Sequence, residues 1–262
     1  MKFVSSAQNS HIKHVRKLAN TASYRAKQGQ TVLEGVHLCE SYAQQNSVPQ
    51  LCIVSETGAE NPEVGAILRT IATKNVPTLA VPDTLFGSIS QLEQGVGVLF
   101  VIDVPRQNSA PIITETALLL DDVQDPGNLG TMLRTAAAAG VRRVYLSAAC
   151  ANVWAPKVLR AGMGAQFVLE MYEAVDLAAA IQAAQIPVLA TSLQATKTLY
   201  EYDLAGETAW LFGSEGRGVS PKLQNLCGDS LVIIPQQSNV ESLNVAAATA
   251  VCLFEQRRQQ QK

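Results

Sequence analysis

The hydrophobic positions of this 262-residue chain fall into short, continuous apolar runs that alternate with segments of helical periodicity. The run at 95–103 is almost entirely apolar, which is typical of a strand buried on both faces. The segments between such runs place apolar residues three and four positions apart, as in a helix with one buried face. Strands that alternate with helices predict an α/β fold with a mostly parallel sheet.

In the first part of the chain we predict a basic helix up to about residue 28, followed by alternating elements. The expected strands are 31–35, 50–56, 76–82 and 95–103, and the expected helices are 36–45 and 62–74. Residues 104–116 are rich in Pro, Ser, Asn and Thr without a clear period, which is typical of a linker. The chain therefore divides into a domain at 1–103, this linker, and a domain at 117–262.

The second domain continues the alternation. A helix at 128–139 is expected to end at Gly140, because glycine is favoured just after a helix. The final helix is expected from about Ser242 to Arg258. The other expected strands are 117–122, 141–147, 167–172, 186–192, 208–215 and 230–235, and the other expected helices are 154–163 and 175–185.

Composition excludes several classes of protein. Hydrophobic residues make up 47% and charged residues 16%, which indicates a packed core. No apolar run has the length of a membrane span and the first residues lack a signal-peptide core, so we expect a cytoplasmic protein. The five cysteines are scattered singly, and Asp121, Asp122 and Asp125 lack a matched partner downstream, so neither zinc nor magnesium is expected.

The charge distribution is uneven along the chain. A formal net charge of −2 argues against a protein that coats nucleic acid. Residues 1–33 nevertheless hold no acidic residue and several basic ones, namely Lys2, Lys13, Arg16, Lys17, Arg25 and Lys27. Such a segment is either a phosphate-contacting surface or a solvated helix face, and composition leaves both interpretations open.

Polar loops follow three of the apolar strands in the second domain. They begin "DPGNLG" at 125, "GSEGRG" at 213 and "PQQSNVESLN" at 235. Because ligands bind at the carboxyl ends of parallel strands, we expect these loops to converge on one edge of the sheet. None of them matches a dinucleotide turn, a phosphate-binding P-loop or the nucleophile elbow of a hydrolase.

Several residues in these loops have an expected structural role, and Arg134 has two interpretations. Asn128 is expected to cap the following helix, and Arg134 lies beside the apolar stripe of that helix. Arg134 is either an ordinary exposed arginine or a group that contacts a phosphate or a hydroxyl. In the third loop, Ser238 and Glu241 fit a capping box before the last helix, while Ser242 and Asn244 are expected to open it.

Taken together, three segments resemble the SpoU (TrmH-like) family of RNA 2′-O-ribose methyltransferases, which belongs to the SPOUT superfamily. They are "DPGNLGTMLRTA" at 125–136, "LFGSEGRGVS" at 211–220 and "IIPQQSNVESLNVAAATA" at 233–250. The run "SYRAKQGQTVLEGVHLCESY" at 23–42 is similar to part of the N-terminal substrate-binding domain of the family. Two departures stand out: Gly162 where a serine is common, and "PQQSN" in place of Pro-Met-x-Gly.

The resemblance implies a fold, a cofactor and an assembly. The fold is an α/β methyltransferase domain with a trefoil knot, preceded by an L30e-like α/β domain that binds RNA. The cofactor is S-adenosyl-L-methionine, and two chains form a homodimer. The implied cofactor contacts are Gly213, Ile234 and Leu243, and the implied catalytic residues are Asn128, Arg134, Glu215, Ser242 and Asn244.

The same resemblance implies methyl transfer to a ribose 2′-hydroxyl of RNA, with 23S rRNA favoured because tRNA-specific members can lack the extra N-terminal domain. We expect Arg134 to bind the adjacent phosphate and help to activate the hydroxyl, although a guanidinium is a poor base. Arg16, Lys17, Arg25 and Lys27 are the expected RNA contacts. The alternatives are a tRNA methyltransferase and a non-catalytic RNA-binding member of the same fold.

Overall fold

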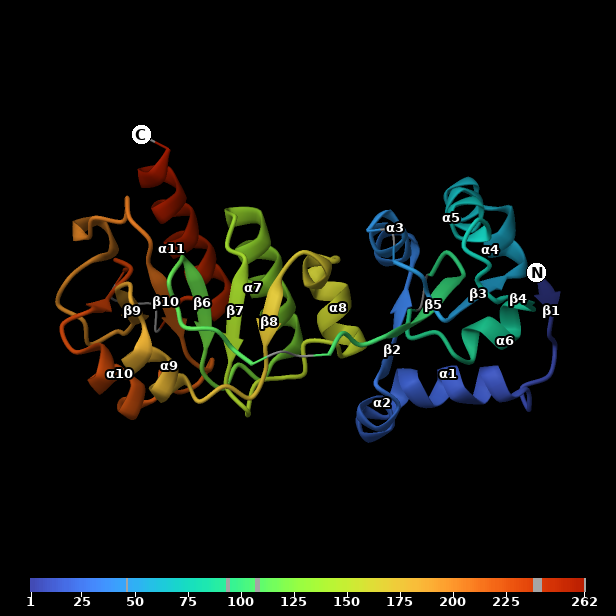
Figure 1. Ribbon diagram of the computed structural model, residues 1–262, viewed down its shortest axis with the longest axis horizontal. Coiled ribbons are helices and arrows are strands. Elements are labelled where there is room, and N and C mark those ends of the chain that lie inside the picture. The colour runs from blue at the N-terminus through green and yellow to red at the C-terminus, as the bar shows by residue number, and fades with distance from the viewer. Residues whose placement is uncertain (46, 93–94, 107–108, 238–241, 262) are drawn as a thin grey trace. The chain divides into compact units, whose positions relative to one another are not determined.

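The computed structural model describes residues 1–45, 47–92, 95–106, 109–237 and 242–261. Contacts divide the chain into two compact units, one formed by 1–106 with 154–167 and the other by 107–153 with 168–262 (Figure 1). Each unit is a β-sheet with helices packed against it. The α/β architecture expected from the alternation of strands and helices is therefore confirmed.

The first unit is a mixed sheet with the strand order β1-β4-β3-β5-β2. Strand β5 runs antiparallel to both of its neighbours, and the other pairs are parallel. Its strands are β1 (Lys2–Phe3), β2 (Gln30–Glu34), β3 (Leu51–Ser55), β4 (Thr78–Val81) and β5 (Val98–Asp103). Its helices are α1 (Ser10–Asn20), α2 (Ala22–Gln28), α3 (Val36–Gln44), α4 (Glu56–Glu60), α5 (Pro62–Ala72), α6 (Asp83–Gly87) and α8 (Pro156–Gly162).

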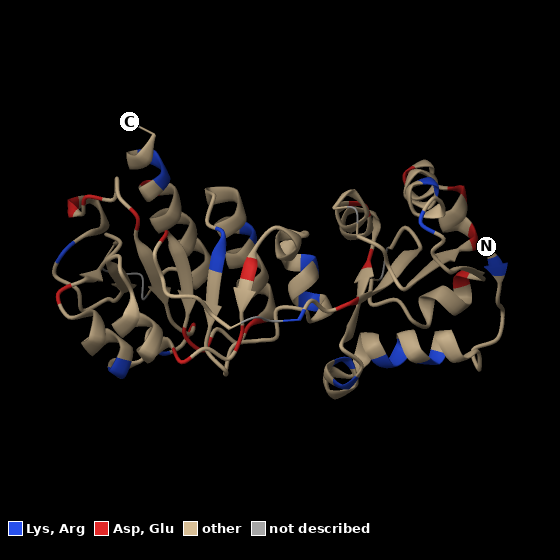
Figure 2. Cartoon of the chain, viewed as in Figure 1, with Lys and Arg blue, Asp and Glu red and all other residues tan. Residues whose placement is uncertain are grey.

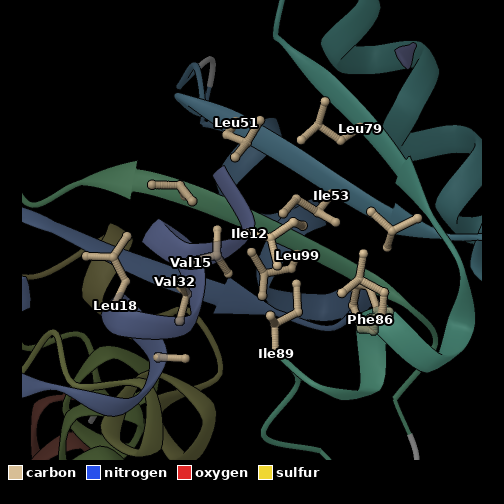
Figure 3. Packing of buried hydrophobic residues seen from close by; sticks show 14 of the residues in the cluster. Ile12, Val15, Leu18, Val32, Leu51, Ile53, Leu79, Phe86, Ile89 and Leu99 are labelled. Carbon is tan, nitrogen blue, oxygen red and sulfur yellow. The ribbon is translucent and has the colours of Figure 1, made fainter. Parts of the chain in front are cut away.

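Helix α1 covers one face of this sheet with a continuous apolar stripe. Ile12, Val15 and Leu18 lie three residues apart and are fully buried, as a helical period requires. They pack against strand residues such as Val32 and Leu99 (Figure 3). Burying each such side chain stabilises the fold by about 1.5–3 kcal/mol, so this cluster fixes the position of α1 on the sheet.

The predicted single basic helix up to residue 28 is wrong, because the chain breaks into two helices. Thr21 has an extended backbone (φ −128°) and separates α1 from α2. The guanidinium of Arg25 donates to the carbonyl of Leu18 at 2.8 Å, which satisfies a free carbonyl in the last turn of α1. Strand β1 and the short helices α4 and α6 are also present, although no periodic signal predicted them.

The second unit has a sheet with the strand order β11-β9-β10-β6-β7-β8, and neighbouring strands run parallel. Its strands are β6 (Ala117–Leu120), β7 (Arg143–Leu146), β8 (Glu170–Tyr172), β9 (Val188–Thr191), β10 (Ala209–Phe212) and β11 (Leu231–Val232). Its α-helices are α7 (Pro126–Ala139), α9 (Leu177–Ala183), α10 (Pro221–Cys227) and α11 (Val245–Gln260). Strands β6 and β10 are neighbours, so the loops that follow them start side by side.

Alternating side chains of the strands serve the two faces of this sheet. Leu119 and Leu211 join the cluster that α9 and α10 cover. Trp210, the neighbour of Leu211 in β10, points to the opposite face, where its indole N–H donates to Gln256 of α11 at 2.6 Å. Helix α11 packs against α7 on that face (Figure 1). The prediction of a parallel sheet covered on both sides is therefore confirmed.

Three boundaries in the second unit differ from the predictions. Helix α7 starts at Pro126 rather than at Asn128, and its N-cap is Asp125. Helix α11 starts at Val245, so the segment from 242 precedes the helix and Asn244 is its N-cap. The predicted strand at 230–235 reduces to β11, and the proposed capping box of Ser238 and Glu241 lies outside the described residues.

Residues 109–116, the described end of the expected linker, hold neither helix nor strand but are attached to the second unit. Ile113 is buried, and its carbonyl accepts from the backbone N–H of Gln185 at 2.9 Å. The Tyr145 hydroxyl donates to the carbonyl of Pro111 at 3.1 Å. Among the described helices, none has the length and apolarity needed to cross a bilayer.

Candidate active site

The loop after β10 folds tightly back on itself. Ser214 and Gly218 form an antiparallel bridge, with N···O distances of 3.1 Å and 2.8 Å between their backbones. A Cβ on Gly213 would lie 1.9 Å from the carbonyl carbon of Gly218, so only glycine allows this approach. Gly218 itself has φ +65°, the left-handed region that glycine tolerates without strain.

Two asparagine amides connect this loop to two helix N-termini. The Oδ1 of Asn244 caps α11 by accepting from the backbone N–H of Ala246 at 2.9 Å, so its Nδ2 is left to donate to Asn128 Oδ1 at 3.0 Å. Because Asn128 Oδ1 is the acceptor there, its own Nδ2 donates to Glu215 Oε1 at 2.9 Å. Each amide therefore has one permitted orientation, and the series of hydrogen bonds ends on the carboxylate of Glu215.

Asn128 is available for this contact because it does not cap its own helix, which corrects the expectation. The carboxylate of Asp125 takes that place and accepts from the backbone N–H of Asn128 at 2.7 Å. Asp121, which is largely buried at the end of β6, accepts from the backbone N–H of Ser220 at 2.8 Å. Asp125 therefore caps its own helix, whereas Asp121 holds the loop after β10 against the end of β6.

A cavity of about 680 Å³ lies beside these loops. Among the predicted residues, Gly213, Glu215, Ile234, Ser242, Leu243 and Asn244 line it. The loop after β9 also contributes to the wall, although no sequence motif pointed to it; its residues there are Thr191, Ser192, Leu193 and Gln194. Gln236 and Arg217 line the cavity as well and were likewise missed.

The surface of this cavity is suited to a small ligand with an apolar part and polar groups. Leu193 and Leu243 are 60% and 40% exposed, although most leucines of this chain are buried. Exposed apolar surface in a concave wall with a few convergent polar groups is typical of a ligand site. Within the described residues, no group of three or more His, Cys, Asp or Glu side chains is arranged to hold a metal ion.

Arg134 lies apart from the other predicted catalytic residues within one chain. It is exposed on α7, does not line the cavity, and makes no ion pair or side-chain hydrogen bond with the described residues. Asn128 precedes it by six positions, which turns the two side chains by about 120° around the helix axis. The structure therefore brings Asn128, Glu215 and Asn244 together but leaves Arg134 free on the outer face of α7.

The four expected RNA contacts lie on α1 and α2, where basic residues recur (Figure 2). Arg16 donates to Ser88 Oγ at 2.9 Å, and Lys17 lies 5.4 Å from the centre of the Tyr24 ring. Partial burial lowers the pKa of Arg25, whose guanidinium is occupied by α1 carbonyls. Lys27 is exposed. Arg25 therefore has a structural role, Arg16 is half-buried, and Lys17 and Lys27 are exposed.

Comparison with known proteins yields matches over both units. The profile of the SpoU rRNA Methylase family matches residues 115–254, and that of the MRM3-like substrate binding domain matches residues 9–99. An uncharacterized tRNA/rRNA methyltransferase of Synechocystis sp. is 36% identical over 98% of this chain and 94% of its own length. The 23S rRNA (guanosine(2553)-2′-O)-methyltransferase RlmP of Bacillus subtilis is 30% identical over 97% of this chain and 98% of its own length.

Solved structures agree with these relatives. The AdoMet-bound rRNA methyltransferase from Sinorhizobium meliloti superposes with a TM-score of 0.84 at 27% identity, covering 98% of this chain and 97% of that one. The SpoU methyltransferase AviRb from Streptomyces viridochromogenes shares the fold, with a TM-score of 0.84 at 23% identity over 97% and 99% of the two chains. Fold and site together define an RNA methyltransferase of the SPOUT type. The chain belongs to the SpoU rRNA methylase family.

Proposed function

We propose that this protein transfers a methyl group from S-adenosyl-L-methionine to the ribose 2′-hydroxyl of a guanosine in 23S rRNA. The observation that supports it most is the hydrogen-bonded chain Asn244–Asn128–Glu215 beside a cavity of about 680 Å³. The relatives RlmP and the Pseudomonas putida RlmB, which is 31% identical over 87% of this chain and 96% of its own length, are named for this reaction on 23S rRNA.

The residues of the cavity fit the cofactor. Gly213 leaves room at the turn of the loop, and Ile234 and Leu243 offer apolar contacts to an adenosine group. When bound, S-adenosylmethionine supplies a methyl group on a cationic sulfur. The hydrogen bonds of Asn128, Glu215 and Asn244 keep the three loops in register, and Ser242 offers a hydroxyl at the cavity wall. Holding the reacting groups in line is the main source of rate in such a site.

Arg134 acts on the RNA side of this reaction. Its position outside the cavity wall suits a contact with the phosphate beside the target ribose, and its permanent charge argues against a role as the base. A phosphate bound there fixes the 2′-hydroxyl relative to the methyl group. The proton acceptor is then a different group.

Two chains form a homodimer through the outer faces of α7 and α11. Ala138, Ala247 and Phe254 are exposed on these helices, and Phe254 retains 46% of its accessible surface. Thr131, Arg134 and Ala138 follow one face of α7 at helical spacing. Pairing of these faces buries the apolar residues and brings Arg134 against the second chain.

The two domains divide the work of recognition and chemistry. Residues 1–103 form the L30e-like RNA-binding domain, 104–116 the linker, and 117–262 the methyltransferase domain with its trefoil knot, from which residues 154–167 pack with the first unit. The match of the substrate-binding profile to residues 9–99 and the basic faces of α1 and α2 support the first assignment. A protein that modifies ribosomal RNA works in the cytoplasm, where ribosomes are assembled.

The proposal is tested by the substitution Arg134→Ala. We expect methyl transfer to 23S rRNA to fall at least 100-fold, because the target ribose loses its fixed position, while binding of S-adenosylhomocysteine stays unchanged. Tritiated methyl incorporation into 23S rRNA from a strain that lacks the enzyme measures the first, and calorimetric titration measures the second.

Arg142→Ala, a change at an exposed arginine elsewhere in the same unit, serves as the control and should retain activity. Full activity of Arg134→Ala would remove this residue from the mechanism. Methylation of tRNA in place of 23S rRNA under the same conditions would contradict the proposed substrate. Absence of any cofactor binding by the unchanged protein would favour a non-catalytic RNA-binding role.

A further inference from the structure

The wall of the cavity contains an amide oxygen that lacks a partner. Gln236 follows β11 and lines the cavity, and its Oε1 is buried without a hydrogen-bond donor among the described residues. Buried polar atoms in folded proteins are almost always hydrogen-bonded, because an unpaired acceptor has lost its water without compensation. The unpaired Oε1 therefore indicates a donor that a ligand brings.

A second glutamine in the same wall, Gln224, differs from Gln236 in that its amide is hydrogen-bonded within the protein. Gln224 uses both ends of its amide within the protein, since Nε2 donates to the carbonyl of Val219 at 2.7 Å and Oε1 accepts from Ser192 Oγ at 3.3 Å. Gln224 thus fixes the loops around the cavity, whereas Gln236 Oε1 is left for a ligand. Gln237, the next residue, is exposed and does not line the cavity.

The surroundings of Gln236 restrict the kind of donor. A carboxylate or phosphate carries no proton to donate at neutral pH, and an ammonium group is better matched by the carboxylate of Glu215 in the same wall. The exposed leucines Leu193 and Leu243 favour a flat apolar group. A purine base with an exocyclic amine meets both conditions, and glutamine pairs with adenine through its acceptor and donor side by side.

The geometry points to Gln236 as an adenine-recognising residue: its Oε1 accepts a hydrogen bond from the exocyclic amine of the cofactor. This inference rests on the proposed function, because it assumes that S-adenosylmethionine occupies the cavity. It also gives a physical meaning to the departure of "PQQSN" from the usual Pro-Met-x-Gly, since the position that is commonly methionine carries an amide here.

The test compares S-adenosylhomocysteine with its purine riboside analogue, in which hydrogen replaces the exocyclic amine. Calorimetric titration gives the Kd of each for the unchanged protein and for Gln236→Met, which keeps the side-chain volume. We expect removal of the amine and removal of the amide each to weaken binding about three- to tenfold. The two losses should not add, because both remove the same hydrogen bond.

Two further variants separate recognition from a change in loop shape. Gln236→Glu retains an acceptor oxygen and should retain the preference for the amine, while the control Gln237→Met should bind both compounds as the unchanged protein does. Equal discrimination by Gln236→Met and the unchanged protein would overturn the inference. So would coupling of Gln236 to a ribose hydroxyl, read from the 2′-deoxy and 3′-deoxy analogues. Failure of the unchanged protein to bind S-adenosylhomocysteine would instead refute the proposed function.

Discussion

At the scale of single residues, the absence of a side chain at Gly213 has the clearest consequence. A methyl group there would overlap the backbone of Gly218, so the bridge between Ser214 and Gly218 has to open. Gly216 in the same loop offers a matched control, because a Cβ at that position meets no atom within 4 Å. Both glycines belong to the same loop motif, but only Gly213 lies against another part of the backbone.

For Gly213→Ala we therefore expect a loss of about 1–3 kcal/mol in the free energy of unfolding and at least tenfold weaker binding of S-adenosylhomocysteine. For Gly216→Ala the free energy of unfolding should change by less than about 0.5 kcal/mol. Urea denaturation and calorimetric titration measure the two quantities. Equal stability and equal binding of both variants would show that the close approach at Gly213 is unimportant.

Much of the candidate site was predictable at this scale, because parallel strands bring their carboxyl ends to one edge. That rule predicted the convergence of three loops, and the contacts of Asn128, Glu215 and Asn244 confirm it. The orientation of the two amides was not predictable, because it depends on the N–H groups of α11 that donate to Asn244 Oδ1 in the folded protein. The unpaired oxygen of Gln236 was equally invisible, because burial of one atom is a property of the folded loop.

At the scale of helices and strands, α1 and α2 together carry five basic residues, namely Lys13, Arg16, Lys17, Arg25 and Lys27. Arg25 joins the two helices through the carbonyl of Leu18. Lys17 and Lys27 are exposed, and the half-buried Arg16 donates to a serine hydroxyl rather than to a helix-end carbonyl. Neutralising these three residues should therefore weaken RNA binding without unfolding the unit. Neutralising Arg25 is a poorer test, because it also removes a contact that satisfies the end of α1.

We expect the triple substitution Arg16→Gln, Lys17→Gln and Lys27→Gln to reduce the slope of log K against log salt by roughly 2–3, since each lost phosphate contact removes about one. Filter binding of an rRNA fragment at several salt concentrations gives the slope, and the thermal midpoint should stay within a few degrees. Arg69→Gln on α5 is the control and should leave the slope unchanged. An unchanged slope in the triple variant would show that this basic surface is only solvated.

The ends of helices and strands are harder to predict from local sequence than their existence. Asp125 and Asn128 are both good capping residues, so sequence alone did not decide which begins α7. In the structure Asp125 is the cap, and Asn128 instead contacts Asn244 and Glu215, which lie 116 and 87 positions away. Likewise, the break at Thr21 lies in a segment whose helical pattern continues on both sides. Existence of the elements was predictable, but long-range contacts set their ends.

At the scale of the whole molecule, buried thiols in both units connect folding to pH. Burial raises the pKa of Cys52 in the first unit to about 12, and it raises the pKa of Cys252 in the second unit to about 12. In the unfolded chain these thiols ionise near their ordinary pKa of about 8.5. The folded state therefore binds more protons at high pH, and stability is complete below about pH 8.5 and falls as the pH rises toward 12.

Each buried thiol should reduce the free energy of unfolding by about 1.4 kcal/mol per pH unit above pH 9. Urea denaturation at pH 8, 9.5 and 10.5 measures this slope for the unchanged protein and for Cys252→Ala. For the variant, the fall in the free energy of unfolding should be smaller by about 1.4 kcal/mol per pH unit, whatever its stability at pH 8. An identical slope in both proteins would mean that Cys252 ionises as readily when folded as when unfolded.

The hydrogen bonds that join Asn128 with Glu215 and Asn244 also bear on when the site forms during synthesis of the chain. A ribosome releases Asn128 long before the other two residues, because 116 positions separate it from Asn244. Until the segment with Asn244 emerges, Asn128 lacks that hydrogen-bond donor, and the cavity lacks the part of its wall that Ser242, Leu243 and Asn244 form. The hydrogen-bonded site thus takes its final arrangement only after translation of the segment that carries Asn244.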